Sequence, residues 1–345
     1  MAGAAAGSCT LASKALWAAQ PAPSSNETDK TPLPRRVLGR TGQEVSTVVF
    51  PGLAMTQQEQ DLCTTAVHRA FERGVNYFDV APAYGNGTAE TRLGIALQGI
   101  DRSRLFLACK TKMRDKEGAR QELERSLQRL KTDHFDLYQM HLLRTPDEVK
   151  QALGPGGAME TFLKAREEGK VRFFGFSAHT TKGALEALKG YAFDTVMFPV
   201  NYIEYLQHGF GRAVIEEAGR QGTAVIGMKA LYNGTWPEGA QTRHKWWYRS
   251  FETEEDIRMA LRFTLSLPGV VAAVPPAFVD ITDTAVTAAR SCQPITEAET
   301  EKLRELGKGI ESLFRRDEQR VAAGLSPHDS PYPDHLHACC PYANA

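Results

Sequence analysis

Short runs of β-branched and aromatic residues alternate with helical segments along most of the chain, and this alternation constrains the fold more than any other feature. Eight such runs can be counted, and the segments between them carry apolar residues at helical spacing and often end at glycine. This order is typical of parallel strands joined by crossover helices. Eight strands suit a closed (β/α)8 TIM barrel better than an open sheet. The expected strands are 45–50, 76–81, 104–110, 135–141, 171–177, 193–200, 223–230 and 270–277.

The repeating units occupy one continuous stretch, which predicts a single barrel domain at residues 35–315. A β-hairpin around Thr41 and Gly42 is expected before the first barrel strand. The chain has 345 residues, of which 42% are hydrophobic and 24% charged, as in a globular enzyme with a large core. Residues 316–345 are rich in proline at their end, and we expect a flexible tail there.

The first 34 residues differ in composition from the rest of the chain. Residues 1–19 are rich in alanine and contain no acidic residue, and a Pro/Ser/Asn/Thr linker follows them, as in part of an export signal. The only charge before residue 20 is Lys14, so a working signal would need an earlier start codon. A disordered Ala-rich tail fits the same residues. Both a cytoplasmic and an exported, periplasmic location therefore stay open.

The charges of the chain balance, with 41 Lys and Arg against 41 Asp and Glu. No overall field would therefore draw the protein to nucleic acid or to an anionic membrane. No apolar run approaches the roughly 20 residues of a membrane helix. We expect neither a nucleic-acid partner nor a membrane span.

Four polar side chains stand at or just after the ends of consecutive predicted strands. Asp79 lies near the end of strand 76–81, and Tyr84 follows in the next loop. Lys110 and His141 close the next two strands. The carboxyl ends of barrel strands meet at one mouth, where barrel active sites lie. Each residue alone has an ordinary structural role, such as a helix cap or a buried histidine. The four together favour a catalytic group.

Their chemistry suits the reduction of a carbonyl, which needs a proton donor beside the oxygen. Tyr84 can donate this proton, but a free phenol has a pKa of about 10. A nearby cation, here Lys110, would help the phenol to work near neutral pH. Asp79 would keep that buried lysine charged and positioned, and His141 would orient the carbonyl through a ring nitrogen.

The segment 76–97 closely resembles the aldo-keto reductase family. The family pattern has Asp at this strand end, Tyr followed by Gly five residues later, and then Glu and Leu-Gly, which are Glu90 and Leu93-Gly94 here. The resemblance covers roughly residues 35 to 310. It implies an oxidoreductase that reduces an aldehyde or ketone with hydride from a nicotinamide cofactor. The alternative is a cofactor-sensing regulatory subunit, as in the potassium-channel β subunits that resemble the same family.

The resemblance also implies where the cofactor binds. No GxGxxG opens a helix after the first strand, so a dinucleotide-binding sheet is disfavoured. The family holds the nicotinamide with a Ser-Asn pair, a Gln and a stacking aromatic. Here the serine is kept, while Ala178, Met197 and Met228 replace the other three. With the loop after the seventh strand included, the expected cofactor-binding residues are Ser177, Asn201, Met228, Lys229, Leu231 and Asn233.

The choice between NAD and NADP depends on the segment 274–286. Relatives carry basic residues there for the adenosine 2′-phosphate, but this segment has none and contains Asp280 and Asp283. Carboxylates near a ribose favour its free hydroxyls. We expect little discrimination in favour of NADPH.

A long insertion, 232–256, separates the seventh strand from its helix on the side where barrel active sites lie. Its aromatic residues could line a substrate pocket, or the loop could pack them on itself. Both interpretations stay open. These residues are Trp236, Trp246, Trp247 and Tyr248.

Two possible metal sites are disfavoured. The last residues offer several His and Cys side chains, but Cys339 and Cys340 are adjacent and no C-x₂-C spacing occurs. A metal-dependent barrel hydrolase would need His and carboxylate ligands clustered at strand ends, and the first strand ends in Phe50-Pro51-Gly52. We therefore predict no metal. The tail histidines are His328, His335 and His337.

Overall fold

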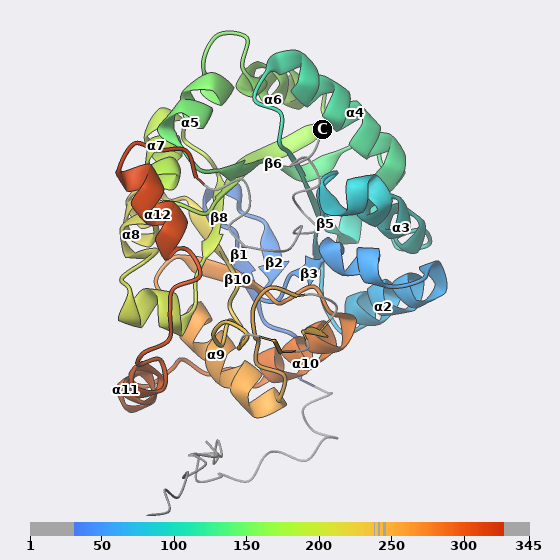
Figure 1. Ribbon diagram of the computed structural model, residues 1–345. Helices are drawn as coiled ribbons and strands as arrows, with labels where there is room; N and C mark the ends of the chain where they lie inside the picture. Colours follow the sequence, from blue (N-terminus) through green and yellow to red (C-terminus); the bar gives the residue numbers. More distant parts are fainter. Residues whose placement is uncertain (1–30, 238, 241, 244–245, 328–345) are drawn as a thin grey trace, which may run out of the picture.

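The computed structural model describes residues 31–237, 239–240, 242–243 and 246–327. Eight parallel strands follow one another in spatial order, as the sequence predicts for a (β/α)8 barrel (Figure 1). A bridge between Val48 and Ala273 brings the first and last strands together. The strands are β3 (Phe50–Pro51), β4 (Tyr77–Asp79), β5 (Phe106–Thr111), β6 (Phe135–Leu143), β7 (Val171–Ala178), β8 (Thr195–Pro199), β9 (Ala224–Met228) and β10 (Val270–Val274).

The predicted hairpin is present as β1 (Arg35–Val37) and β2 (Glu44–Ser46). Gly42 has φ 69°, in the left-handed region that glycine enters without a steric cost. Leu38 and Val45 of the hairpin are fully buried and join the residues that fill the barrel interior. The hairpin therefore closes the amino-terminal end of the barrel and leaves the carboxyl-terminal end for the site.

A ring of helices covers the outside of the barrel (Figure 1). Several of them begin at a Thr or Asp whose side chain accepts a backbone N–H of the first turn, as Asp115, Thr145, Thr180 and Thr253 do. The helices that follow the strands are α2 (Gln60–Glu72), α3 (Thr88–Ala96), α4 (Lys116–Leu130), α5 (Pro146–Leu153), α6 (Ala158–Glu167), α7 (Thr181–Gly190), α8 (Arg212–Gln221), α9 (Glu254–Ser266) and α10 (Val279–Arg290).

Alternate strand residues point into the barrel, and their character changes along the strands. Tyr77, Phe106 and Leu137 belong to the apolar cluster of the interior. Two to four residues further along the same strands, Asp79, Lys110 and Gln139 are polar and buried. Because strand side chains alternate, a shift of one residue would turn these groups towards the helices. The register therefore brings the polar groups together near the carboxyl-terminal end.

The expected start of a flexible tail at residue 316 is wrong for the part that the structure describes. Residues 297–306 form α11 (Glu297–Leu306), and α12 (Arg315–Ala322) packs on α7. Phe314 is 1% exposed, and the carboxylate of Glu318 accepts the N–H of Thr181. The helix is therefore held by burial and by capping. The possible export signal (1–34, apart from its last residues) and the His/Cys tail lie outside the described residues.

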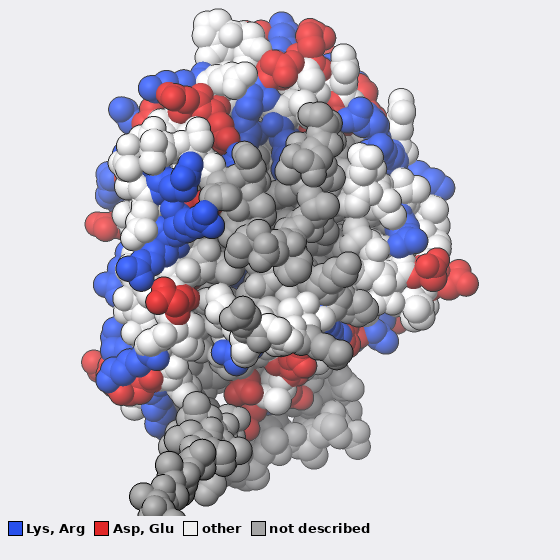
Figure 2. Space-filling model, viewed as in Figure 1, with Lys and Arg blue, Asp and Glu red and all other residues white. Residues whose placement is uncertain are grey.

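The described part of the chain contains no helix long and apolar enough to cross a membrane. On the face shown in Figure 2, lysine and arginine side chains are interspersed with aspartate and glutamate.

Candidate active site

Asp79 and Lys110 form a buried ion pair at the ends of β4 and β5. The Lys110 ammonium donates to Asp79 Oδ1 and also to the carbonyl of Val80 at 3.3 Å. Both side chains are at most 4% exposed. Burial raises the pKa of Asp79, and Lys110 and Gln139 oppose part of this rise. Removal of one partner of so deeply buried an ion pair destabilises the protein, since the other charge is left uncompensated.

Tyr84 reaches the same lysine from the loop after β4. The loop turns through three consecutive residues with positive φ, at 58°, 50° and 89°, two of which are glycines. Its tight turn directs Tyr84 back over the strand ends, where the Lys110 Nζ lies 3.4 Å from the phenol oxygen. The ammonium is also 5.2 Å from the centre of the Tyr84 ring. The cation is therefore placed to stabilise a phenolate.

His141 is the fourth predicted residue, and the structure brings it to the other three. Its ring meets the Tyr84 ring edge to face, with centroids 5.6 Å apart and planes at 89°. Burial lowers the pKa of His141 well below its usual value, and the nearby charges of Lys112, Lys110 and then His179 and Arg114 lower it further. The imidazole is thus neutral near pH 7. Within the described residues its Nδ1 has no hydrogen-bond partner.

This low pKa predicts how His141 affects stability. The unfolded chain binds a proton at about pH 6.5 that the folded protein excludes. The free energy of unfolding should therefore fall as the pH drops below about 6.5, by up to about 1.4 kcal/mol per pH unit from this group. Urea unfolding of wild type and His141→Gln across this range measures the effect. Equal slopes for both proteins would show that His141 is not kept neutral by the fold.

Gln139 is a site residue that the sequence analysis missed. Its Nε2 donates to Asp79 Oδ2 at 2.9 Å, opposite the oxygen that Lys110 holds. The period-two pattern could have found it, because Gln139 lies two residues before His141 on β6 and must face the same interior. The Asp79 carboxylate is thus fixed by two donors.

The expected nicotinamide-binding residues lie at the ends of the next three strands. Ser177 is the next-to-last residue of β7 and is buried, and its hydroxyl accepts the N–H of Leu142 at 2.8 Å. Asn201 is fully buried after β8, and its Oδ1 accepts the N–H of Glu204 at 2.9 Å. Its Nδ2 has no partner in the part that the structure describes. Met228 ends β9 and belongs to the interior cluster.

The three residues expected at the cofactor phosphates differ in their surroundings. The Lys229 ammonium lies 4.9 Å from the centre of the Trp247 ring and 5.9 Å from that of Tyr248. The side chain of Leu231 is fully buried in the outer core. The side chain of Asn233 accepts the Tyr202 hydroxyl at 3.3 Å. Of the three, only Lys229 offers a cation near the loop.

Three aromatic residues of the insertion pack on one another, namely Trp246, Trp247 and Tyr248. Trp246 lies 3.9 Å from Trp247 and 5.4 Å from Tyr248, measured between ring centres, and it is 5% exposed. It also packs against Phe278, with ring centres 5.1 Å apart. These contacts favour self-packing of the insertion, with Trp246 as its core.

The insertion also brings a cation to the segment 274–286, which has none of its own. Arg243 pairs with the carboxylate of Asp280 and lies 4.2 Å from the centre of the Phe278 ring. Burial raises the pKa of Asp280, but Arg243 and backbone N–H groups at the start of α10 together hold the pKa below its usual value. This pair could not be predicted from the sequence, because the two residues are far apart in the chain and one lies in an irregular loop.

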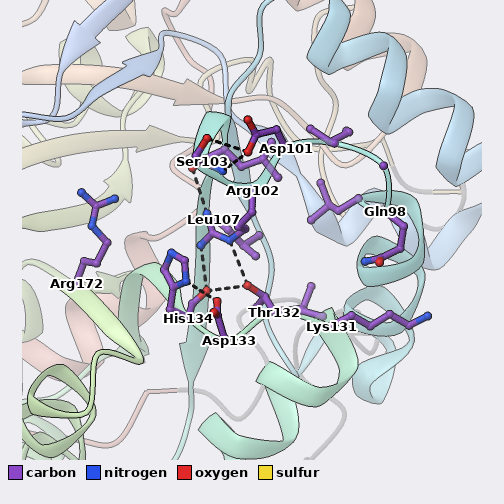
Figure 3. A pocket seen from close by; sticks show the side chains of 15 residues that line it. Gln98, Asp101, Arg102, Ser103, Leu107, Lys131, Thr132, Asp133, His134 and Arg172 are labelled. Carbon is purple, nitrogen blue, oxygen red and sulfur yellow. Dashed lines mark hydrogen bonds and ion pairs between the residues drawn. The ribbon is translucent and has the colours of Figure 1, made fainter.

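A hollow at the opposite end of the barrel is not a candidate for the reaction. It has a volume of about 850 Å³ and lies beside the loops that precede β5 and β6 (Figure 3). Its arginines are engaged, since Arg102 and Arg172 bind the buried Asp136 at 2.8 and 2.6 Å. Barrel enzymes react at the carboxyl ends of their strands, not at this end. Among the described residues, no group of three His, Cys, Asp or Glu could hold a metal ion.

Comparison with known proteins agrees with this geometry. The model of the aldo/keto reductase family matches residues 50–257, which is more than half of the chain. The chain belongs to the aldo/keto reductase family. The match begins at β3 and includes the strands that carry Asp79, Lys110 and His141.

Curated proteins match the chain over shorter stretches. L-galactose dehydrogenase of Arabidopsis thaliana is 31% identical over 161 residues, which cover 43% of this chain and 49% of the relative. An uncharacterized oxidoreductase of Bacillus subtilis is 30% identical over 42% of the chain and 48% of that relative. The chain thus spans about half the length of these curated relatives. Methylglyoxal reductase of Escherichia coli is 28% identical over 53% of the chain and 67% of the relative.

Solved aldo-keto reductases share the fold. The holo form of an enzyme from Bacillus halodurans matches with a TM-score of 0.65 at 22% identity, over 81% of this chain and 98% of the other. An aldo-keto reductase of Klebsiella pneumoniae in complex with NADPH matches with a TM-score of 0.62 at 20% identity, over 80% of this chain and 96% of the other. At these identities the likeness concerns the fold.

Proposed function

We propose that this aldo/keto reductase reduces the carbonyl of a small aldehyde or ketone to an alcohol with hydride from NADH or NADPH. The observation that carries the proposal is the Lys110 ammonium, which contacts both the Asp79 carboxylate and the Tyr84 phenol. Membership of the family supports the proposal, as do the reductase and dehydrogenase names of the relatives and the NADPH of one structural neighbour.

In this proposal Tyr84 is the general acid. The phenol donates its proton to the carbonyl oxygen, and Lys110 stabilises the phenolate that remains. Asp79 and Gln139 hold the lysine through the carboxylate. The neutral His141 is then a hydrogen-bonding group that orients the carbonyl, because an imidazole with a low pKa keeps both a donor and an acceptor.

The chain also carries groups that fit a nicotinamide. The buried Asn201 Nδ2 is a donor without a partner among the described residues, and Ser177 keeps a hydroxyl hydrogen after accepting the N–H of Leu142. An amide or hydroxyl of this kind suits the carboxamide of the ring, and the Met228 thioether can pack against the ring face. The cofactor, when bound, supplies the hydride. Lys229 would meet the phosphates.

Two measurements test this function. Fluorescence titration with NADH and with NADPH should give saturable binding of at least one cofactor. A panel of aldehydes and ketones should then oxidise the bound cofactor at a rate proportional to enzyme. Binding without turnover on any carbonyl would favour the regulatory-subunit alternative, and the absence of binding would contradict both.

The Arg243–Asp280 pair should set the choice of dinucleotide. In the wild type the two charges largely cancel, so we expect little preference for NADPH. Arg243→Met leaves the charge of Asp280 uncompensated and should weaken NADPH binding relative to NADH binding by about tenfold. Asp280→Asn should have the opposite effect, since a charged hydrogen bond contributes about 1.5–3 kcal/mol. Dissociation constants of both cofactors for the three proteins check this. An unchanged ratio in both variants would place the adenosine ribose elsewhere.

A further inference from the structure

β6 departs from regular strand geometry at the residue after His141. Its pairing with β7 shifts register between Met140 and Leu143, and Leu142 has φ 59°. Few residues other than glycine adopt this left-handed conformation, and such strain persists only where the surroundings hold it in place. Strained residues of this kind gather at functional sites. The extra residue thus forms a bulge directly beside a predicted site residue.

Two side chains hold this bulge from different elements. The Arg114 Nη2 donates to the carbonyl of His141 at 2.8 Å and to that of Leu142 at 3.0 Å. The Ser177 hydroxyl accepts the N–H of Leu142 at 2.8 Å. Arg114 therefore binds both carbonyls of the bulge, and Ser177 binds its N–H. Both side chains are buried or nearly so.

Arg114 is itself fixed in the loop between β5 and α4. Its side chain is 13% exposed, and its carbonyl accepts the N–H of Ala158 at 2.9 Å. The Glu148 carboxylate lies 3.8 Å from Nη2, longer than a direct hydrogen bond. The shortest contacts of this nitrogen are thus those to the two carbonyls. Burial of a guanidinium to this extent costs free energy, which argues against a role as an ordinary surface charge.

We propose that Arg114 is a positioning residue, which fixes the bulge at Leu142 and so aims the His141 imidazole at Tyr84 and the substrate carbonyl. This inference rests on the function proposed above. His141 directly precedes the strained residue, and its ring is the one that meets Tyr84 edge to face. Without these contacts the backbone at His141 could shift, and the imidazole would then move relative to the phenol.

Arg114 has an electrostatic effect on the same ring. The groups that face His141 and lower its pKa, after burial, are Lys112, Lys110, His179 and Arg114, from the ends of β5 and β7 and the loop after β5. Removal of the Arg114 charge should thus raise the pKa of His141 while the other three groups remain. This shift gives a readout that a purely structural arginine far from the imidazole would not produce.

The first test uses Arg114→Met and Arg114→Lys without cofactor or substrate. Arg114→Met removes the charged hydrogen bonds to the carbonyls of His141 and Leu142, so the bulge should open more often. We expect hydrogen exchange of the Leu142 amide to accelerate by about tenfold or more in this variant, and by less in Arg114→Lys. The imidazole of His141, assigned by comparison with His141→Gln, should titrate at higher pH. Unchanged exchange and titration would overturn the proposal, whatever the activity.

The second test follows carbonyl reduction at saturating cofactor. We expect kcat/KM of Arg114→Met to fall on the order of 10²-fold, because misplacement by about 1 Å can cost that much. Cofactor affinity should be unchanged. Leu142→Gly removes the strain at this position, so it should restore part of the activity in the Arg114→Met background. Arg172→Met is the matched control, since it removes an arginine from the other end of the barrel and Asp136 keeps Arg102.

The outcomes separate the inference from the proposed function. Faster exchange, a raised His141 titration and rescue by Leu142→Gly support the role of Arg114. Full activity of Arg114→Met, or the same loss in Arg172→Met, would overturn it even if the protein is a carbonyl reductase. If the wild type turns over no carbonyl, the proposed function fails, and the exchange and titration of the first test still decide whether Arg114 fixes His141.

Discussion

Replacement of Tyr84 with phenylalanine is expected to reduce carbonyl reduction by about 10²–10⁴-fold, the usual contribution of a general acid. The cofactor dissociation constant should change little, because the phenol faces Lys110 and His141 and is not among the groups expected to hold the nicotinamide. The ring stays in place, so the edge-to-face contact with His141 is kept. Steady-state rates and cofactor titration of wild type and Tyr84→Phe measure the two effects.

Tyr77→Phe provides a matched control. Tyr77 is also a buried tyrosine of the barrel, two residues before Asp79, and its hydroxyl has no partner within the described residues. Loss of this hydroxyl should leave turnover within a few-fold of wild type. If Tyr84→Phe were equally mild, Tyr84 would not be the proton donor. If both variants lost most of their activity, the loss would reflect disturbance of the barrel interior and not removal of the general acid.

Asp79 and Lys110 are expected to act as one unit. Asp79→Asn should weaken the hold on the lysine, and Lys110→Met removes the cation, so both take away the stabilisation of the Tyr84 phenolate. Each should shift the acidic limb of alcohol oxidation to higher pH, because the phenol then releases its proton less easily. Since both changes damage one mechanism, the double variant should be scarcely worse than either single variant.

A double-mutant cycle on kcat/KM, measured from about pH 5 to 10, tests this coupling. Removal of one partner of a buried pair also costs stability, typically about 3–5 kcal/mol, so the free energy of unfolding is measured for each variant and activity is compared only for folded protein. Simple multiplication of the two losses would show that the residues work independently. Asp79 would then be a strand-end residue with no part in the charge of Lys110.

The parts of the fold that follow a periodic pattern could be predicted from the sequence. The eight strands, the hairpin and the order of helices appear as predicted, because alternation of side chains and helical spacing are local properties. The meeting of Asp79, Lys110 and His141 followed from the same rule, since parallel strands end at one mouth. The first barrel strand is shorter than expected, at Phe50–Pro51, because the first residues of the predicted strand 45–50 lie in β2 and pair with β1 in the hairpin.

The parts that depend on distant contacts could not be predicted. α12 is fixed by the buried Phe314 and by Glu318 at the start of α7, and neither contact is visible in local composition. The pairing of Arg243 with Asp280 joins an irregular loop to a helix start. The bulge at Leu142 depends on Arg114 from another loop, and no turn residue marks it in the sequence. In each case a tertiary contact overrides or adds to the local pattern.

The central claim is that Tyr84 protonates a carbonyl that receives hydride from the cofactor. The measurement that tests it most directly is deuterium transfer from nicotinamide labelled at C4 to a carbonyl substrate, followed by mass spectrometry of the alcohol. We predict one deuterium on the carbinol carbon with wild type and with Tyr77→Phe, and a rate of labelled product lower by about 10²–10⁴-fold with Tyr84→Phe. Labelled alcohol formed at the wild-type rate by Tyr84→Phe, or no labelled alcohol from the wild type with either cofactor, would contradict the claim.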